Sequence, residues 1–124
     1  MLSVLSVPFT LTHAVEDFSA GIPVARFGLA LLPAAFVLSL SYTAQVAAAA
    51  LSARGDVRGD ALNLLLALVW LVGAVADHLG EIVFVPTSAY RAGLVSKALE
   101  VGIIVIAAGW TLASFSVLRT QQRH

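Results

Sequence analysis

Long apolar runs separated by short polar breaks form the main pattern of this chain. Residues 24–53, 61–85 and 94–118 are apolar over most of their length, with few charged positions inside them. A helix needs about 20 mostly apolar residues to cross a bilayer core about 30 Å thick. The pattern therefore predicts that each of these three segments is a membrane-spanning helix.

A fourth, weaker apolar segment covers residues 2–20. It is mostly apolar up to Thr12 and then carries His13, Glu16 and Asp17. A cleaved signal peptide is the alternative interpretation, but no Lys or Arg precedes the apolar core, and the end of the segment lacks a good A-x-A cleavage pattern. We expect a helix here, and the sequence leaves open whether the segment is retained in the mature protein.

The breaks between these segments carry helix-start and turn signals. Pro23 suits the start of the second helix, and the polar turn 54–60 ends in Asp60, a good N-cap for the third. Pro86 closes that helix. Because all connections are short, consecutive helices should pack antiparallel. The prediction is an all-α fold, an integral membrane four-helix up-and-down bundle that forms a single domain, residues 1–124, with helices at about 2–20, 24–53, 61–85 and 94–118.

Composition excludes most other protein classes. The chain has 124 residues, of which 60% are hydrophobic and 11% charged, whereas soluble domains carry about 45–50% apolar and about 25% charged residues. The absence of cysteine excludes a disulfide scaffold. Seven basic and seven acidic residues cancel, so no nucleic acid is expected as a partner. Membrane lipid is the expected partner, and the small-residue run 44–53 also suits a homo-oligomer.

The ionisable residues gather at one depth of the predicted bundle. In antiparallel order, the ends of the first and third helices and the starts of the second and fourth lie on one side of the membrane. Charged groups in a bilayer are costly unless they turn inward and find partners. We therefore expect one polar site near one leaflet, built from His13, Glu16, Asp17, Arg26, Asp77, His78, Glu81, Lys97 and Glu100.

Two His-x-x-Glu pairs make a metal site the leading interpretation. His13 with Glu16, and His78 with Glu81, are spaced to share a helix face, and these residue types suit zinc, iron or manganese. Acids outnumber bases in the layer, so a divalent metal ion would balance the charge. A buried ion network that only locks helix packing is the alternative.

The remaining polar residues take supporting roles in this interpretation. Asp17 and Asp77 are expected to orient the histidines or add ligands, and Glu100 to move a proton. Arg26 and Lys97 are expected to compensate the acidic charge. Without a metal, the same groups could run acid–base chemistry such as isomerisation.

Short motifs along the chain resemble the HXXEE-motif family of small bacterial membrane proteins. His-Ala-Val-Glu-Asp-Phe at 13–18, followed by Gly-Ile-Pro at 21–23, is similar to the family's His-x-x-Glu-Glu, aromatic and Gly-Phe-Pro pattern. His78 and the Tyr90–Ser96 stretch are similar to its later part, with Arg91-Ala92 in place of Ser/Asn-Pro. The resemblance implies a multi-pass protein of the bacterial inner membrane and supports the position of the site, but it implies no particular reaction.

Three functional hypotheses remain open at this point. The first is a metal-dependent enzyme that acts on a lipid-like or small apolar substrate. The second is a proton- or cation-coupled transporter that works as a dimer, for which acid–histidine groups are suitable relays. The third is a non-catalytic membrane subunit. The pattern does not indicate the substrate.

Overall fold

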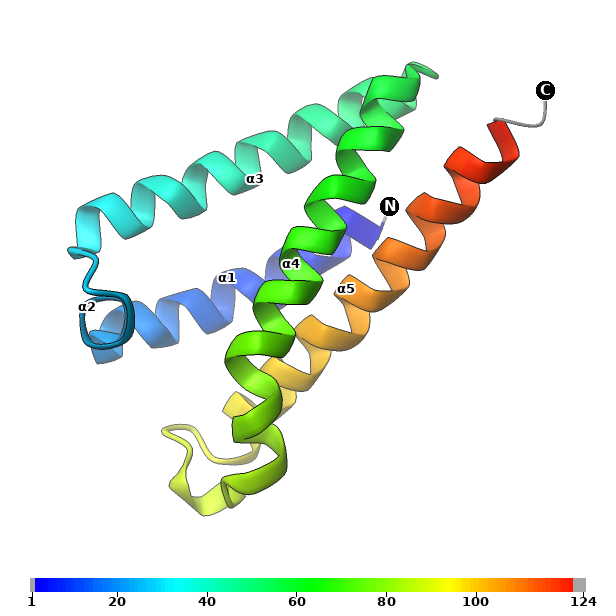
Figure 1. Ribbon diagram of the computed structural model, residues 1–124. Coiled ribbons are helices and arrows are strands. Elements are labelled where there is room, and N and C mark those ends of the chain that lie inside the picture. Colours follow the sequence, from blue (N-terminus) through cyan, green and yellow to red (C-terminus); the bar gives the residue numbers. More distant parts are fainter. Residues whose placement is uncertain (1, 122–124) are drawn as a thin grey trace.

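The computed structural model describes residues 2–121, and this part of the chain is all-helical, without a strand. Four long helices and two short ones follow one another along the chain (Figure 1). The elements are α1 (Leu2–Ala20), α2 (Ile22–Phe27), α3 (Leu31–Ala53), α4 (Val57–Phe84), the short 3₁₀ helix η1 (Thr87–Ala89) and α5 (Leu94–Gln121). The all-α prediction is confirmed, and the predicted helix at residues 2–20 coincides with α1.

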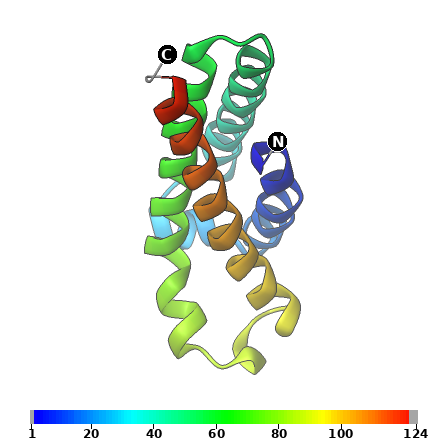
Figure 2. The ribbon, with the colours of Figure 1, turned by 90° about the vertical axis from the view of Figure 1, so that its right-hand side faces the viewer.

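The four long helices pack as a bundle. Helix α4 lies between α3 and α5, and α1 packs mainly against α5 and more lightly against α3. Helices α3 and α4 meet at the turn that joins them and diverge toward α2 (Figure 1), while α5 passes beside both α4 and α1 (Figure 2). Residues of α3 and α4, together with Ile22, Pro23 and Phe27 of α2, line a cavity in this region.

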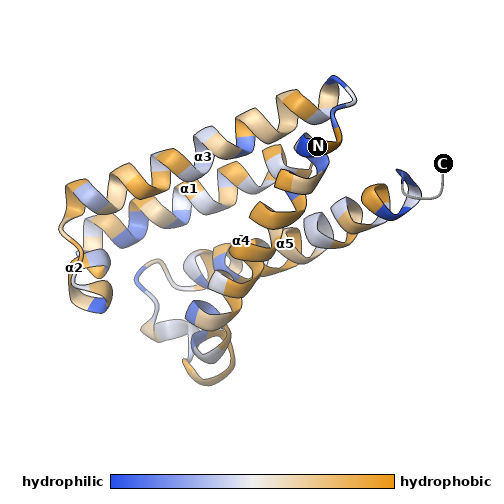
Figure 3. Cartoon of the chain, turned by 45° about the horizontal axis from the view of Figure 1, so that its top comes forward, coloured by the Kyte–Doolittle hydropathy of each residue, from blue (hydrophilic) through white to orange (hydrophobic). Residues whose placement is uncertain are grey.

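Small and polar residues make up most of the interior, where Ile103 and Trp110 are the large apolar side chains among the described residues. Other large apolar side chains cover the outside. Buried polar residues come from all four long helices and include Gln45 and Asn63. Leu32 and Phe84, by contrast, are 82% and 83% exposed, and apolar positions cover the outer faces of the helices (Figure 3). Helices α3, α4 and α5 are each long and apolar enough to cross a membrane. Both properties are consistent with a membrane protein.

The segment predicted as one helix at 24–53 is two helices. Helix α2 ends at Phe27, and Gly28 adopts a left-handed conformation with φ of 64° that favours glycine. The Gly28 N–H donates to the Val24 carbonyl, and the chain restarts as α3 at Leu31. The continuous-helix prediction is wrong because Gly28 lies among apolar residues, so the break has no polar signature.

The start of α4 also differs from the prediction. Asp56 is the N-cap, and its carboxylate accepts a hydrogen bond of 2.9 Å from the Arg58 N–H. Asp60, the predicted cap, lies in the first turn of α4 and accepts a hydrogen bond from Gln121. Here α3 and α4 touch closely, since a Cβ on Gly59 would lie 2.3 Å from the Ser52 nitrogen. Glycine at position 59 thus permits the tight crossing from which the two helices diverge.

Candidate metal centre and its cavity

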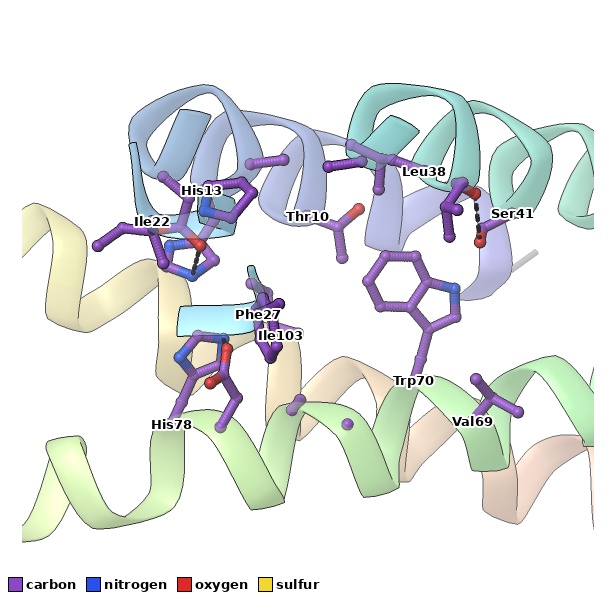
Figure 4. Close-up of a pocket in the computed structure, with 18 of the residues that line it drawn as sticks. Thr10, His13, Ile22, Phe27, Leu38, Ser41, Val69, Trp70, His78 and Ile103 are labelled. Carbon is purple, nitrogen blue, oxygen red and sulfur yellow. Dashed lines mark hydrogen bonds and ion pairs between the residues drawn. The ribbon is translucent and has the colours of Figure 1, made fainter. Parts of the chain in front are cut away.

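His13 of α1, His78 of α4 and Glu100 of α5 meet in the interior of the bundle. The three residues are 8%, 7% and 3% exposed. Each offers a ligand atom, and these atoms lie within 4.8 Å of one another. The two imidazole rings are 4.6 Å apart between centroids and cross at 82° (Figure 4). We refer to these three residues as the His–His–Glu cluster.

Helical spacing places each member of the cluster on the inner face of its helix. On α1 the buried residues are Ser3, Ser6, Thr10 and His13, at intervals of three and four. On α5, Glu100 belongs to a buried stripe with Ser96 and Ile103. Such intervals keep residues on one side of a helix. The pattern that directs α1 and α5 into the bundle therefore also directs His13 and Glu100 toward each other.

A carboxylate stands beside each imidazole. Asp17 Oδ2 lies 3.4 Å from His13 Nε2, and Asp77 Oδ2 lies 3.6 Å from His78 Nε2 (Figure 4). Glu100 Oε1 lies 3.8 Å from His78 Nδ1. Within residues 2–121, both ring nitrogens of His13 and Nδ1 of His78 are buried without a hydrogen-bond partner. Buried polar atoms normally find partners, so this set of nitrogens is suited to a ligand.

Tyr90, in the loop before α5, holds the other oxygen of Glu100. Its hydroxyl donates to Glu100 Oε2 over 3.2 Å, which leaves Oε1 directed at His78. Partial burial and the neighbouring Glu100 carboxylate raise the pKa of Tyr90 to about 12. Tyr90 is not among the site residues predicted from the sequence, because a tyrosine at a helix end is typical of a membrane-interface residue. Its place in the Tyr90–Ser96 motif was the available signal.

We expect Tyr90 to remain protonated at a pH that ionises a free tyrosine. At pH 11 about a tenth of Tyr90 should be ionised, compared with about nine-tenths of a phenol with a pKa of 10. Because the folded-state pKa is the higher one, the folded protein should lose stability as the pH rises from 10 through 12. The measurement is ultraviolet titration of the tyrosinate band, with the Tyr90→Phe spectrum subtracted, since Tyr42 is the other tyrosine.

Glu100→Gln is the control for the cause of this shift. It removes the carboxylate charge that faces the phenol and should lower the Tyr90 midpoint, although burial still raises the pKa of Tyr90. A wild-type difference spectrum with a midpoint near 10 would contradict the Tyr90–Glu100 contact.

Glu16 and Glu81, two of the four predicted metal ligands, have other partners. Glu16 accepts a hydrogen bond from Ser96 of α5. Glu81 and Asp77 both pair with Arg26 of α2. Each glutamate lies one helical turn beyond its histidine, toward the end of the helix, where Ser96 and Arg26 lie. The structure thus brings the two histidines together with Glu100 and directs these two glutamates elsewhere.

The two residues expected to compensate charge differ in their contacts. Arg26 pairs with two acids, as described. Lys97, in contrast, donates to the Val85 carbonyl over 3.1 Å and lies 5.6 Å from the centre of the Tyr90 ring. Its direct partners therefore belong to the loop between α4 and α5, and not to the acids of the site.

A cavity of about 660 Å³ adjoins the two histidines. Residues of α1, α2, α3 and α4 line it, together with Ile103 of α5. His13 and His78 lie at one end of it, and the indole of Trp70 lies toward the other end (Figure 4). Asp17 and Asp77, which also line the cavity, stand beside the two histidines. Most of the remaining lining is apolar. This combination of an apolar chamber and a few convergent polar groups is typical of ligand-binding sites.

Comparison of the chain with protein-family models, with curated proteins and with solved structures gives no match. Membership of the HXXEE-motif family therefore stays a prediction that rests on the motif residues, and the function must be argued from the site.

Proposed function

We propose that the protein is a multi-pass membrane enzyme in which the His–His–Glu cluster holds a divalent metal ion beside an apolar substrate cavity. The proposal includes an integral membrane four-helix up-and-down bundle in the bacterial inner membrane, as the resemblance to the HXXEE-motif family implies. Three helices of spanning length and the apolar outer faces support the membrane location. A lipid-like or small apolar molecule is the proposed substrate class.

The observation that carries the metal proposal is the meeting of three buried ligand groups from three helices. Two histidines and one carboxylate are a known ligand set for catalytic zinc and for iron oxygenases, and three protein ligands leave a position for water or substrate. Ligand atoms around a tetrahedral zinc are about 3.3 Å apart. The cluster atoms, within 4.8 Å of one another, need small side-chain rotations to reach that spacing. The unpartnered nitrogens of His13 and His78 also fit a metal.

The surrounding residues support the cluster. Asp17 and Asp77 can each accept the ring N–H that faces them, which fixes the tautomer and leaves the other nitrogen as an acceptor. Tyr90 holds one oxygen of Glu100 and leaves the other free to bind or to move a proton. A metal ion bound here would activate water or polarise a substrate oxygen. The adjoining cavity would orient an apolar substrate.

The test of this proposal is the metal content of the detergent-purified protein. We expect about one equivalent of zinc, iron or manganese per wild-type chain by mass spectrometry, and a loss of at least about nine-tenths of it in the His13→Ala, His78→Ala double variant. Circular dichroism and gel filtration show whether the variant is folded. If the double variant does not fold, His13→Gln alone should still lower the metal content severalfold.

Wild-type protein that binds no metal after reconstitution would contradict the metal proposal. The same groups would then be an acid–histidine network, and proton-coupled transport by a dimer, metal-free isomerase chemistry or a non-catalytic subunit role would be the hypotheses to test.

A further inference from the structure

The charged residues that line the cavity are all acidic. Among the described residues, Asp17 and Asp77 contribute to its wall, and no lysine or arginine does. A cavity lined by charge of one sign, with low-dielectric walls, concentrates ligands of the opposite sign. The polar end of this cavity therefore favours binding of a positively charged group and disfavours binding of a carboxylate or phosphate.

The nearby bases do not cancel this charge. Arg26 is shared between Asp77 and Glu81, so one guanidinium faces two carboxylates. Arg91 donates to Ser19, and neither residue lines the cavity. Asp17 has a histidine, His13, as its ion-pair partner, and that ring is charged only if protonated.

A second and independent observation is the state of His13. This residue lines the cavity, is 8% exposed, and both of its ring nitrogens are buried without a hydrogen-bond partner. A neutral imidazole offers one nitrogen as an acceptor. A ligand that carries several N–H donors could bond to this nitrogen and to the Asp17 carboxylate at the same time.

The rest of the cavity is suited to an apolar chain. Its wall runs along α4 from Leu66 to Asp77, a length of about 17 Å at the helical rise of 1.5 Å per residue. Leu66, Val69 and Trp70 line the end of this path that is far from the acids, and Leu38 of α3 faces them. The length of the cavity and the distribution of its lining residues are therefore suited to a molecule with one polar head group and one apolar tail.

We propose that the cavity binds an amphiphile whose protonated amine lies between Asp17 and Asp77 and whose apolar tail extends past Trp70. This inference rests on the membrane location of the proposed function and names the substrate class of the same site, but it does not depend on a bound metal. In the metal-free protein, a head group with several N–H donors satisfies both carboxylates and the open nitrogen of His13. A neutral alcohol does so only in part, and an anion does not.

Trp70 provides the probe for the test. The protein has two tryptophans, and Trp110 is buried at 3% exposure and is not part of the cavity wall. The protein in phosphatidylcholine nanodiscs at pH 7 is titrated with dodecylamine, dodecanol or dodecanoate, and tryptophan emission is recorded. We expect saturable binding with dodecylamine tightest, at least about tenfold tighter than dodecanol, and dodecanoate weakest. The signal should be absent in Trp70→Phe, which keeps Trp110 and controls for general bilayer effects.

Removal of one acid tests the head-group contact. Asp17→Asn should weaken dodecylamine binding at least about tenfold and leave dodecanol within about threefold. Asp60→Asn makes the same change outside the cavity, where Asp60 bonds to Gln121, and should leave both ligands unaffected. Competition with phosphatidylethanolamine identifies the source of the amine: displacement of dodecylamine supports a membrane lipid, and no displacement supports a soluble amine.

Separate titrations with zinc distinguish this inference from the metal proposal. Dodecylamine binding by a protein that binds no zinc would support the amine site alone. Equal binding of the three probes, or a dodecylamine affinity unchanged by Asp17→Asn, would overturn the amine site. Dodecanoate binding that appears only with zinc, together with no preference for dodecylamine in the zinc-free protein, would also overturn it, while supporting the metal proposal.

Discussion

Glu100→Gln is expected to lower the affinity of the protein for zinc by more than about a hundredfold. Mutation of groups that only orient metal ligands already costs about 10–100-fold. Among the described residues, Glu100 is the carboxylate that forms a cluster with both histidines. The amide keeps the size of the side chain and can still accept from Tyr90, but it removes the negative charge. Competition with a chromophoric chelator measures the affinity, and gel filtration controls for folding.

Glu16→Gln and Glu81→Gln are the matched controls, since they make the same change in the two glutamates that the His-x-x-Glu spacing selects. Glu16 bonds to Ser96 and Glu81 to Arg26, so each variant should change zinc affinity less than about tenfold. Losses in these two variants as large as that in Glu100→Gln would assign the metal to the pairs of the sequence motif instead of the His–His–Glu cluster.

The sequence predicted which ionisable residues lie together at one end of the bundle better than it predicted their partners. Short connections make consecutive helices antiparallel. The prediction therefore brings together the ends of α1 and α4 and the start of α5. That reasoning brought His13, His78 and Glu100 to one region. Spacing on one helix, however, says nothing about the neighbour that each side chain meets. The motif therefore does not indicate that Glu16 bonds to Ser96 or that Glu81 pairs with Arg26.

The helix break at Gly28 and the contact between Tyr90 and Glu100 depend on backbone geometry that the pattern of apolar and polar residues does not predict. The break at Gly28 lies in an apolar run and is defined by a backbone conformation. Tyr90 reaches Glu100 because the loop between α4 and α5 folds back over the start of α5. The cavity likewise follows from the divergence of α3 and α4 beyond Gly59, a close contact that the sequence shows only as a glycine near a turn.

The ion pairs of Arg26 with Asp77 and Glu81 should stabilise the contact of the short helix α2 with α4. Reversal of the Arg26 charge should therefore destabilise the bundle. Arg26→Glu places three acids together and is expected to lower the free energy of unfolding by about 2 kcal/mol. This is less than the 3–5 kcal/mol for breaking a fully buried pair, because the side chains of Arg26, Asp77 and Glu81 are 34%, 26% and 35% exposed. Thermal unfolding in detergent, followed by circular dichroism, measures the loss as a drop of several degrees.

The exchanged double variant Arg26→Glu, Glu81→Arg makes the test specific to the contact. It restores opposite charges across the α2–α4 contact, with Arg at position 81 one helical turn from Asp77, so most of the lost stability should return. The single Glu81→Arg variant completes the cycle, and a coupling energy above about 1 kcal/mol is expected for side chains in contact. Additive effects of the two changes would mean that α2 is held by its apolar residues alone. Ile22, Pro23 and Phe27 of α2 line the cavity, so a real coupling would also mean that the same ion pairs hold one wall of the cavity in place.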